Sequence, residues 1–122
     1  MPKAKILIID DEPDIVEVLE DRLIATGFDV RSVLCARDGY AAVAEDAPDL
    51  ILLDIQMPEI SGMEALVELQ KTNPEIPVLM ISASTVKNVA ETAKGKGAVD
   101  FVLKPFDPDT LMQKINEILG IS

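Results

Sequence analysis

The sequence predicts an α/β protein built on a parallel β-sheet, and three observations support this fold class. Short apolar runs alternate regularly with longer amphipathic segments along the chain. Three of the apolar runs lack polar alternation, as expected for strands that helices cover on both faces. The length of 122 residues suits one domain with a substantial core and is short for two. We therefore expect a single domain over residues 1–122 with five strand–helix units.

In the first part of the chain, each predicted strand is followed by a segment with helical spacing of apolar residues. The strands are apolar runs over residues 5–9, 29–34 and 49–54. Pro13 stands at a typical first helical position, and Gly27 closes the helix that follows. The next two helices are predicted over residues 38–47 and 62–72. The run at 29–34 is the weakest of the three strands.

In the remaining part, two more strands are predicted over residues 77–82 and 101–103. The helix between them, over residues 86–94, is weakened by two nearby glycines. The last helix has the clearest start, with Asp107 as the N-cap and Pro108 at the first helical position. These two units bring the total to five.

The topology follows from the order of the units and from strand hydrophobicity. Parallel strands joined by helices form right-handed crossovers, so helices cover both faces of the sheet. The three strongly apolar strands belong in the centre, and the second and fifth belong at the edges. The predicted strand order is 2-1-3-4-5, the flavodoxin-like arrangement, in which ligands bind between the carboxyl ends of the first and third strands.

Polar residues follow the predicted strands at that edge of the sheet. Asp10 and Asp11 follow the first strand and Asp54 ends the third, so three carboxylates should converge. Close carboxylates disfavour joint ionisation, and a hard divalent cation relieves this conflict. Mg²⁺ fits best because it accepts carboxylates and leaves positions for phosphate oxygens. Ser82, which ends the fourth strand, adds a hydroxyl group, and Lys104, which follows the fifth strand, adds a cation.

Composition excludes several classes of function. The net charge of −11 would repel a phosphate backbone, which argues against direct nucleic-acid or anionic-membrane binding. Neither a signal peptide nor about 18 consecutive apolar residues is present, so we expect a cytoplasmic location. The single cysteine, Cys35, cannot form an internal disulfide, and we expect it to be a small buried hydrophobe. Without histidine, catalysis would rest on carboxylates, hydroxyls and lysine.

Each of these residues also has a plainer structural interpretation. Asp10 and Asp11 are typical capping residues ahead of a helix that begins with proline. Lys104 would ordinarily be a solvated surface lysine, and Ser82 could satisfy backbone groups at a strand end. The convergence of the three aspartates favours the metal-site hypothesis over capping.

Four segments resemble the receiver domain of two-component response regulators. They are IIDDEPD (8–14), LLDIQMPEISG (52–62), MISAS (80–84) and FVLKPF (101–106). They occur in the family's order and at about its intervals, except for about two extra residues between Gly27 and Gly39. The resemblance covers nearly the whole chain.

The resemblance implies that Asp54 accepts a phosphoryl group from the phosphohistidine of a histidine kinase, from a phosphotransfer protein or from a small acyl phosphate. Asp11 and Asp54 match direct Mg²⁺ ligands, Asp10 a ligand through water, and the Gln56 backbone carbonyl a further ligand. No other cofactor is implied. The domain would not be an enzyme in the usual sense, although it would assist its own phosphorylation and dephosphorylation.

The resemblance also implies how the signal leaves the site. Ser82 matches the hydroxyl that hydrogen-bonds the phosphoryl group, and Lys104 matches the lysine that pairs with it. Phe101 matches an aromatic switch residue, and the peptide bond from Lys104 to Pro105 matches one that is usually cis. The surface of the fourth helix, fifth strand and fifth helix would then change. It would contact a downstream protein, a linked output domain or a second copy of the chain.

Three other functions share parts of this pattern. A phosphatase with an aspartate nucleophile needs a second aspartate two positions on, where this chain has Gln56. A flavin-binding protein with the same sheet needs a glycine- and hydroxyl-rich phosphate loop, and DDEPD would repel that phosphate. An unphosphorylated receiver-like module that only binds proteins is the remaining alternative.

Overall fold

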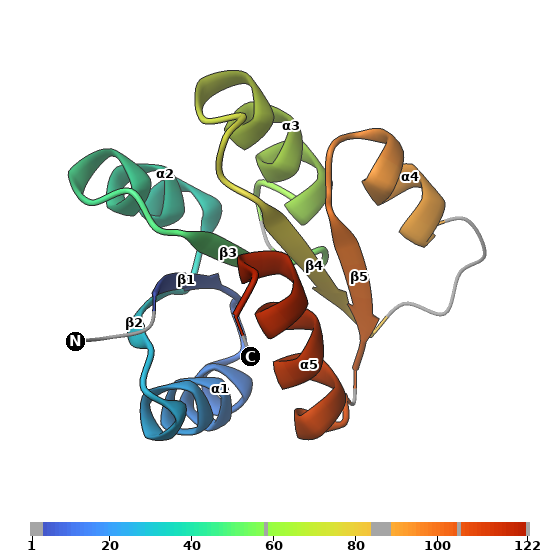
Figure 1. The fold of residues 1–122 in the computed structure, drawn as a ribbon. Helices are drawn as coiled ribbons and strands as arrows, with labels where there is room; N and C mark the ends of the chain where they lie inside the picture. The colour runs from blue at the N-terminus through green and yellow to red at the C-terminus, as the bar shows by residue number, and fades with distance from the viewer. Residues whose placement is uncertain (1–3, 58, 84–88, 105, 122) are drawn as a thin grey trace.

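The computed structural model describes residues 4–57, 59–83, 89–104 and 106–121, in which five strands alternate with five helices (Figure 1). The strands are β1 (Lys5–Ile9), β2 (Asp29–Val33), β3 (Leu50–Asp54), β4 (Val78–Ser82) and β5 (Asp100–Leu103). The helices are α1 (Pro13–Thr26), α2 (Ala36–Glu45), α3 (Gly62–Thr72), α4 (Val89–Gly95) and α5 (Pro108–Leu119).

All four strand pairings are parallel, and the order is β2-β1-β3-β4-β5, which confirms the predicted flavodoxin-like topology. The register aligns the carboxyl ends of the central strands β1, β3 and β4. Ile9 of β1 lies opposite Leu53 of β3, and Asp54 lies opposite Ile81 of β4. Asp10 and Asp54 therefore emerge at the same edge of the sheet.

Two separate hydrophobic cores lie on the two faces of the sheet, between the sheet and the helices that cover it. α1 and α5 cover one face, and α2, α3 and α4 cover the other (Figure 1). Successive residues of a strand point to opposite faces, so Leu52 belongs to the α1/α5 core and Leu53 to the other. All five residues of β3 are buried. This explains why the central strands read as unbroken apolar runs.

The starts of α1 and α5 and the end of α1 lie where the sequence signals predicted them. α1 begins at Pro13 and is closed by Gly27, whose φ of 107° lies in the left-handed region. Asp107 caps α5, where its side chain accepts a hydrogen bond from the Asp109 N–H at 3.1 Å. Among the described helices, none has the length and apolar character needed to cross a bilayer.

The region between β2 and α2 differs from expectation. α2 begins at Ala36, two positions before the predicted start at Asp38, because Ala36 packs into the core. Asp38 therefore lies within the first turn of the helix. Cys35 is the extended N-cap residue of α2 and is partly exposed, so the prediction of a buried cysteine was wrong. The predicted helix over residues 86–94 corresponds to α4, and its first part, residues 86–88, lies outside the described residues.

Candidate functional site

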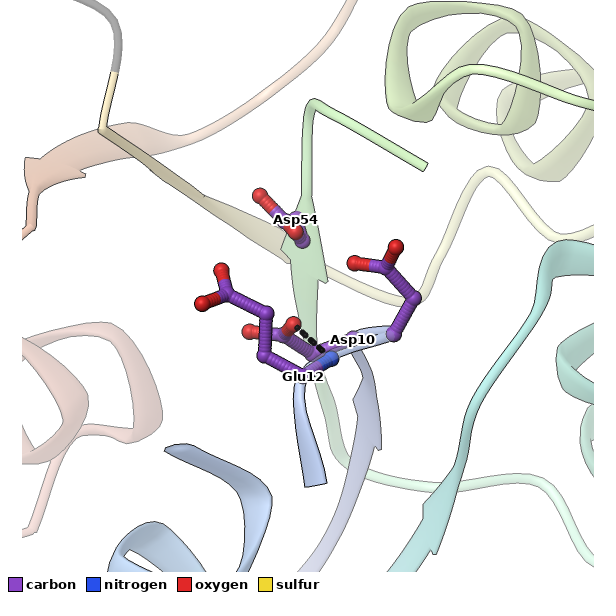
Figure 2. A group of neighbouring side chains, drawn as sticks. Asp10, Glu12 and Asp54 are labelled. Atoms are coloured by element: carbon purple, nitrogen blue, oxygen red, sulfur yellow. Dashed lines mark hydrogen bonds between the residues drawn. The ribbon is translucent and has the colours of Figure 1, made fainter. Parts of the chain in front are cut away.

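The structure brings the three predicted aspartates together at the carboxyl ends of β1 and β3, and Glu12 joins them. One carboxylate oxygen from each of these four residues lies within 4.8 Å of the others. Figure 2 shows the carboxyl groups of Asp10, Glu12 and Asp54 facing a common space. Asp10 and Asp54 are only 2% and 3% exposed, whereas Glu12 lies at the surface. We call these four residues the acidic cluster.

Backbone hydrogen bonds fix the two buried aspartates. The Asp10 N–H donates to the Val33 carbonyl at 3.2 Å, which continues the β1–β2 ladder by one step. The Ile55 N–H donates to the Ile81 carbonyl at 3.1 Å, which continues the β3–β4 ladder directly after Asp54. Asp54 is therefore the last residue of a strand and Asp10 lies one residue beyond another, so neither carboxylate is on a free loop.

The start of α3 packs directly against the backbone that carries Asp54. The Gly62 N–H donates to the Ile55 carbonyl at 2.7 Å. A Cβ at position 62 would lie 2.0 Å from the Asp54 carbonyl oxygen, closer than any non-bonded contact allows. Only glycine fits this approach. Ser61 caps the helix, where its hydroxyl accepts the Glu64 N–H at 3.2 Å.

Lys104 supplies the positive charge at the acidic cluster. Its Nζ lies 2.9 Å from Asp10 Oδ2, 2.8 Å from Glu12 Oε1 and 3.5 Å from Asp54 Oδ2. The side chain is only 7% exposed. The Lys104 N–H donates to the Ser82 carbonyl at 2.8 Å, so the lysine leaves β5 from a fixed backbone position. One lysine thus faces several carboxylates.

Burial and this imbalance of charge change the protonation of Asp54. Burial is the largest cause that raises the pKa of Asp54 to about 7, and the negative charge of Asp10 raises it further. Lys104 and the Gln56 N–H, which donates to Asp54 Oδ1 at 3.3 Å, act in the opposite direction. For Lys104, burial lowers the pKa, but hydrogen bonds to Glu12 and Asp10 outweigh it, and the net shift is upward.

The acidic cluster has the ligand chemistry of a divalent-cation site. Its donors are carboxylate oxygens, which Mg²⁺ prefers, and a cation there would offset the burial and the repulsion from Asp10 that raise the Asp54 pKa. The capping interpretation of Asp10 and Asp11 does not hold for α1, because its N-cap residue is Glu12. Asp10 Oδ1 instead accepts the Glu12 N–H at 2.9 Å (Figure 2). The cluster can therefore bind a metal ion.

The remaining predicted residues lie near this edge or behind it. Ser82 ends β4 and is fully buried, opposite Leu103. Phe101 of β5 lies opposite Met80 and packs, partly buried, against the core under α2, α3 and α4. The roles assigned to these residues and to the Gln56 carbonyl remain predictions. Pro105, and with it the predicted cis peptide bond, lies outside the described residues.

Sequence reasoning missed Glu12. The signal was its position: a glutamate directly before a helix-starting proline is a poor N-cap residue, since Ser, Thr, Asp and Asn are preferred there. Its side chain makes no capping hydrogen bond and contacts Lys104 instead.

Comparison with known proteins identifies the family to which this fold and site belong. A family model for the response regulator receiver domain matches residues 6–116. The chain is therefore a member of the receiver domain family of two-component response regulators.

Individual relatives agree with this assignment. The chain is 36% identical to the chemotaxis protein CheY of Bacillus subtilis, with 95% of this chain and 98% of that protein covered. It is 35% identical to a probable transcriptional regulator, ycf27, of Porphyridium aerugineum, with 98% of this chain and 49% of that protein covered. The crystal structure of the receiver domain of NtrX from Brucella abortus superimposes with a TM-score of 0.91 at 36% identity, covering 96% and 99% of the two chains. The chain spans half or less of the length of several transcriptional regulators that it matches.

Proposed function

We propose that the chain accepts a phosphoryl group on Asp54 in an Mg²⁺-dependent reaction. The observation that carries this proposal is the burial of the Asp54 carboxylate beside Asp10, with the Lys104 ammonium 3.5 Å from Asp54 Oδ2. Asp10, Asp11, Asp54 and the Gln56 carbonyl would hold the metal ion. When bound, the ion supplies neutralisation of the charge on the phosphoryl oxygens.

In the proposed reaction, an Asp54 carboxylate oxygen attacks phosphorus, and the bond from phosphorus to the donor breaks with its electron pair going to the donor. Phosphoryl transfer depends mainly on positioning and on charge neutralisation. Lys104 provides one positive charge, and the Ser82 hydroxyl provides a hydrogen bond. Backbone hydrogen bonds at Asp10 and directly after Asp54 hold the two carboxylates in place. Attack of water on the same phosphorus would later release inorganic phosphate and restore the Asp54 carboxylate.

The proposed donor is a histidine kinase or phosphotransfer protein, because the sequence contains no histidine of its own. The family assignment supports this partner and a cytoplasmic reaction. We propose that the domain assists its own phosphorylation and its later dephosphorylation by water and is not otherwise an enzyme. The charge of −11 supports signalling through protein contacts and not through direct nucleic-acid binding.

The proposed output surface is formed by α4, β5 and α5. Phosphorylation would draw Ser82 and Lys104 towards the phosphoryl oxygens, and Phe101 would turn into the space behind Ser82. Phe101 is suited to this change because it is only partly buried at the border of a core. A downstream protein, a linked output domain or a second copy of the chain would bind the altered surface.

Incubation with Mg²⁺ and acetyl phosphate tests the proposal. We expect intact-mass spectrometry to show addition of one phosphate, and borohydride trapping followed by peptide mapping to place it at Asp54. Asp54→Asn should abolish labelling. Asp14→Asn, which makes the same chemical change at an exposed position on α1, should label like the native chain.

Two results would contradict the assignment. Undiminished labelling of Asp54→Asn would place the phosphate elsewhere. A native chain that no acyl phosphate or phosphohistidine donor labels would favour the module that only binds proteins.

A further inference from the structure

We propose that Glu12 is a positioning residue that holds Lys104 in the unphosphorylated protein, so that an incoming phosphoryl group must displace Glu12 from the lysine. This inference rests on the phosphoryl-acceptor function proposed for Asp54. It adds a residue outside the predicted site, and it assigns that residue an effect on how readily the phosphorylated state forms.

The first argument is the geometry around the lysine. Lys104 Nζ lies 2.8 Å from Glu12 Oε1 and 2.9 Å from Asp10 Oδ2, both at ordinary distances for charged hydrogen bonds. The distance to Asp54 Oδ2 is longer, at 3.5 Å. Since the ammonium has three N–H donors, two are already used by residues that follow β1. The lysine is therefore directed towards the β1 end of the cluster and not primarily towards Asp54.

The second argument is the behaviour of Glu12 at the start of α1. It is the N-cap residue, yet its carboxylate makes no capping hydrogen bond. Its backbone is fixed by the N–H that donates to Asp10 Oδ1 at 2.9 Å. The side chain thus leaves a helix N-terminus, where a negative charge is favourable, and reaches a lysine 92 positions further along the sequence.

The third argument is the difference in exposure between the two partners. The side chain of Glu12 is 56% exposed and that of Lys104 is 7% exposed. An exposed carboxylate regains water when its partner leaves, so this contact can be broken at low cost. Asp10, at 2% exposure, has no such compensation. Glu12 is therefore the carboxylate that the phosphoryl group would replace.

Affinity for beryllofluoride, a phosphoryl analogue that binds aspartate, tests the inference. It should be measured by amide NMR titration at an Mg²⁺ concentration that saturates each variant. Glu12→Gln removes the charge, and Glu12→Asp keeps the charge but shortens the side chain by one methylene group. If Glu12 acts by holding Lys104, both variants should bind beryllofluoride about two- to fivefold more tightly than the native chain. Labelling by limiting acetyl phosphate should accelerate in parallel.

The matched control is Glu17→Gln, the same chemical change at an exposed position one turn further along α1, which should leave both measurements unchanged. Urea unfolding checks that each variant is folded. Glu12→Asp should keep the start of α1 intact, because aspartate is a favourable N-cap residue.

Other outcomes overturn the inference. Tighter binding by Glu12→Gln alone would show that Glu12 acts by direct repulsion of the phosphoryl group. Equal binding by the native chain and both variants would show that Glu12 does not compete for Lys104. A native chain that neither binds beryllofluoride nor accepts phosphate would instead contradict the proposed function, without reference to the variants.

Discussion

Two clusters of lysine and aspartate lie at different places in the molecule and have opposite charge balance. In the acidic cluster, one lysine, Lys104, faces several carboxylates, and the contacting groups of Asp10 and Asp54 are almost completely buried. At β5, one carboxylate faces two lysines: Asp100 Oδ2 lies 2.9 Å from Lys114 Nζ, and Asp100 Oδ1 lies 3.7 Å from Lys94 Nζ. That second cluster is partly exposed, with Asp100 at 29%.

The pKa values show what this difference means. At Asp54, burial and a neighbouring carboxylate raise the pKa to about 7, so the folded protein resists ionisation of the very group that we propose as the nucleophile. At Asp100, burial also raises the pKa, but the hydrogen bonds from Lys114 and the Phe101 N–H outweigh it, and the pKa falls below its usual range. In the first cluster, burial and the charge of Asp10 oppose ionisation of Asp54, and a bound cation can relieve this opposition. In the second cluster, the ion pairs of Asp100 link β5 to α4 and α5.

The largest expected effect comes from crowding the backbone under Asp54. Gly62→Ala places a Cβ 2.0 Å from the Asp54 carbonyl oxygen, so α3 or the end of β3 must shift. We expect the free energy of unfolding to fall by at least about 2 kcal/mol, measured by urea denaturation at pH 7. Labelling of Asp54 by acetyl phosphate should fall as well.

The control for this substitution lies beside the second cluster. Gly95, the last residue of α4, has no atom within 4 Å of an added Cβ. Gly95→Ala should therefore be neutral or stabilise the protein by up to about 1 kcal/mol. A Gly62→Ala variant as stable as Gly95→Ala would contradict the close approach described for α3.

The next effect is a pH dependence with opposite sign in the two clusters. Because the pKa of Asp54 rises from 3.8 to about 7 on folding, ionisation of Asp54 destabilises the protein as pH rises through this window. In metal-free buffer, Asp54→Asn should be more stable than the native chain at pH 8, and the difference should vanish near pH 4. Urea unfolding across this range measures it, and added Mg²⁺ should reduce the difference at pH 8.

Asp21→Asn, an exposed change in α1, controls for the loss of one negative charge. Identical pH profiles for the native chain and Asp54→Asn would mean that the carboxylate is already neutralised by its neighbours.

The smallest effect is expected at Asp100. Because its pKa is lowered on folding, its ionisation stabilises the protein above the unfolded value of 3.8, and this contribution is lost as pH falls through the lower folded pKa. Asp100→Asn should cost about 0.5–1 kcal/mol at pH 7, as expected for a partly exposed ion pair. The loss should shrink in 1 M salt, roughly as screening predicts. A loss that salt does not change would indicate that the Phe101 N–H contact, and not the lysines, is responsible.

Much of the fold could be predicted because local patterns and topology agree. The unbroken apolar runs of β1, β3 and β4 require burial on both faces, and that requirement sets the strand order. The start of α2 could not be placed because its N-cap residue, Cys35, makes no side-chain capping hydrogen bond, and the helix begins where Ala36 meets the core. The partial exposure of Cys35 has the same origin, since it depends on where that helix begins.

The candidate site divides in a similar way. The meeting of Asp10 with Asp54 follows from strand order alone, because Asp10 follows β1, Asp54 ends β3, and these two strands are parallel neighbours. The contact between Glu12 and Lys104 depends on side-chain directions across 92 positions, which no local pattern contains. The close approach of Gly62 to Asp54 likewise required the packing of α3 onto the sheet.

β3, the strand that ends in Asp54, is buried on both faces, so neither face tolerates a change of side-chain volume. Leu52 is enclosed by one helical layer and Leu53 by the other, so a change of volume at either position displaces atoms in a different half of the molecule. Substitutions that accumulate over evolution should therefore collect on the outer faces of the helices, while β3 keeps its side-chain volumes nearly unchanged.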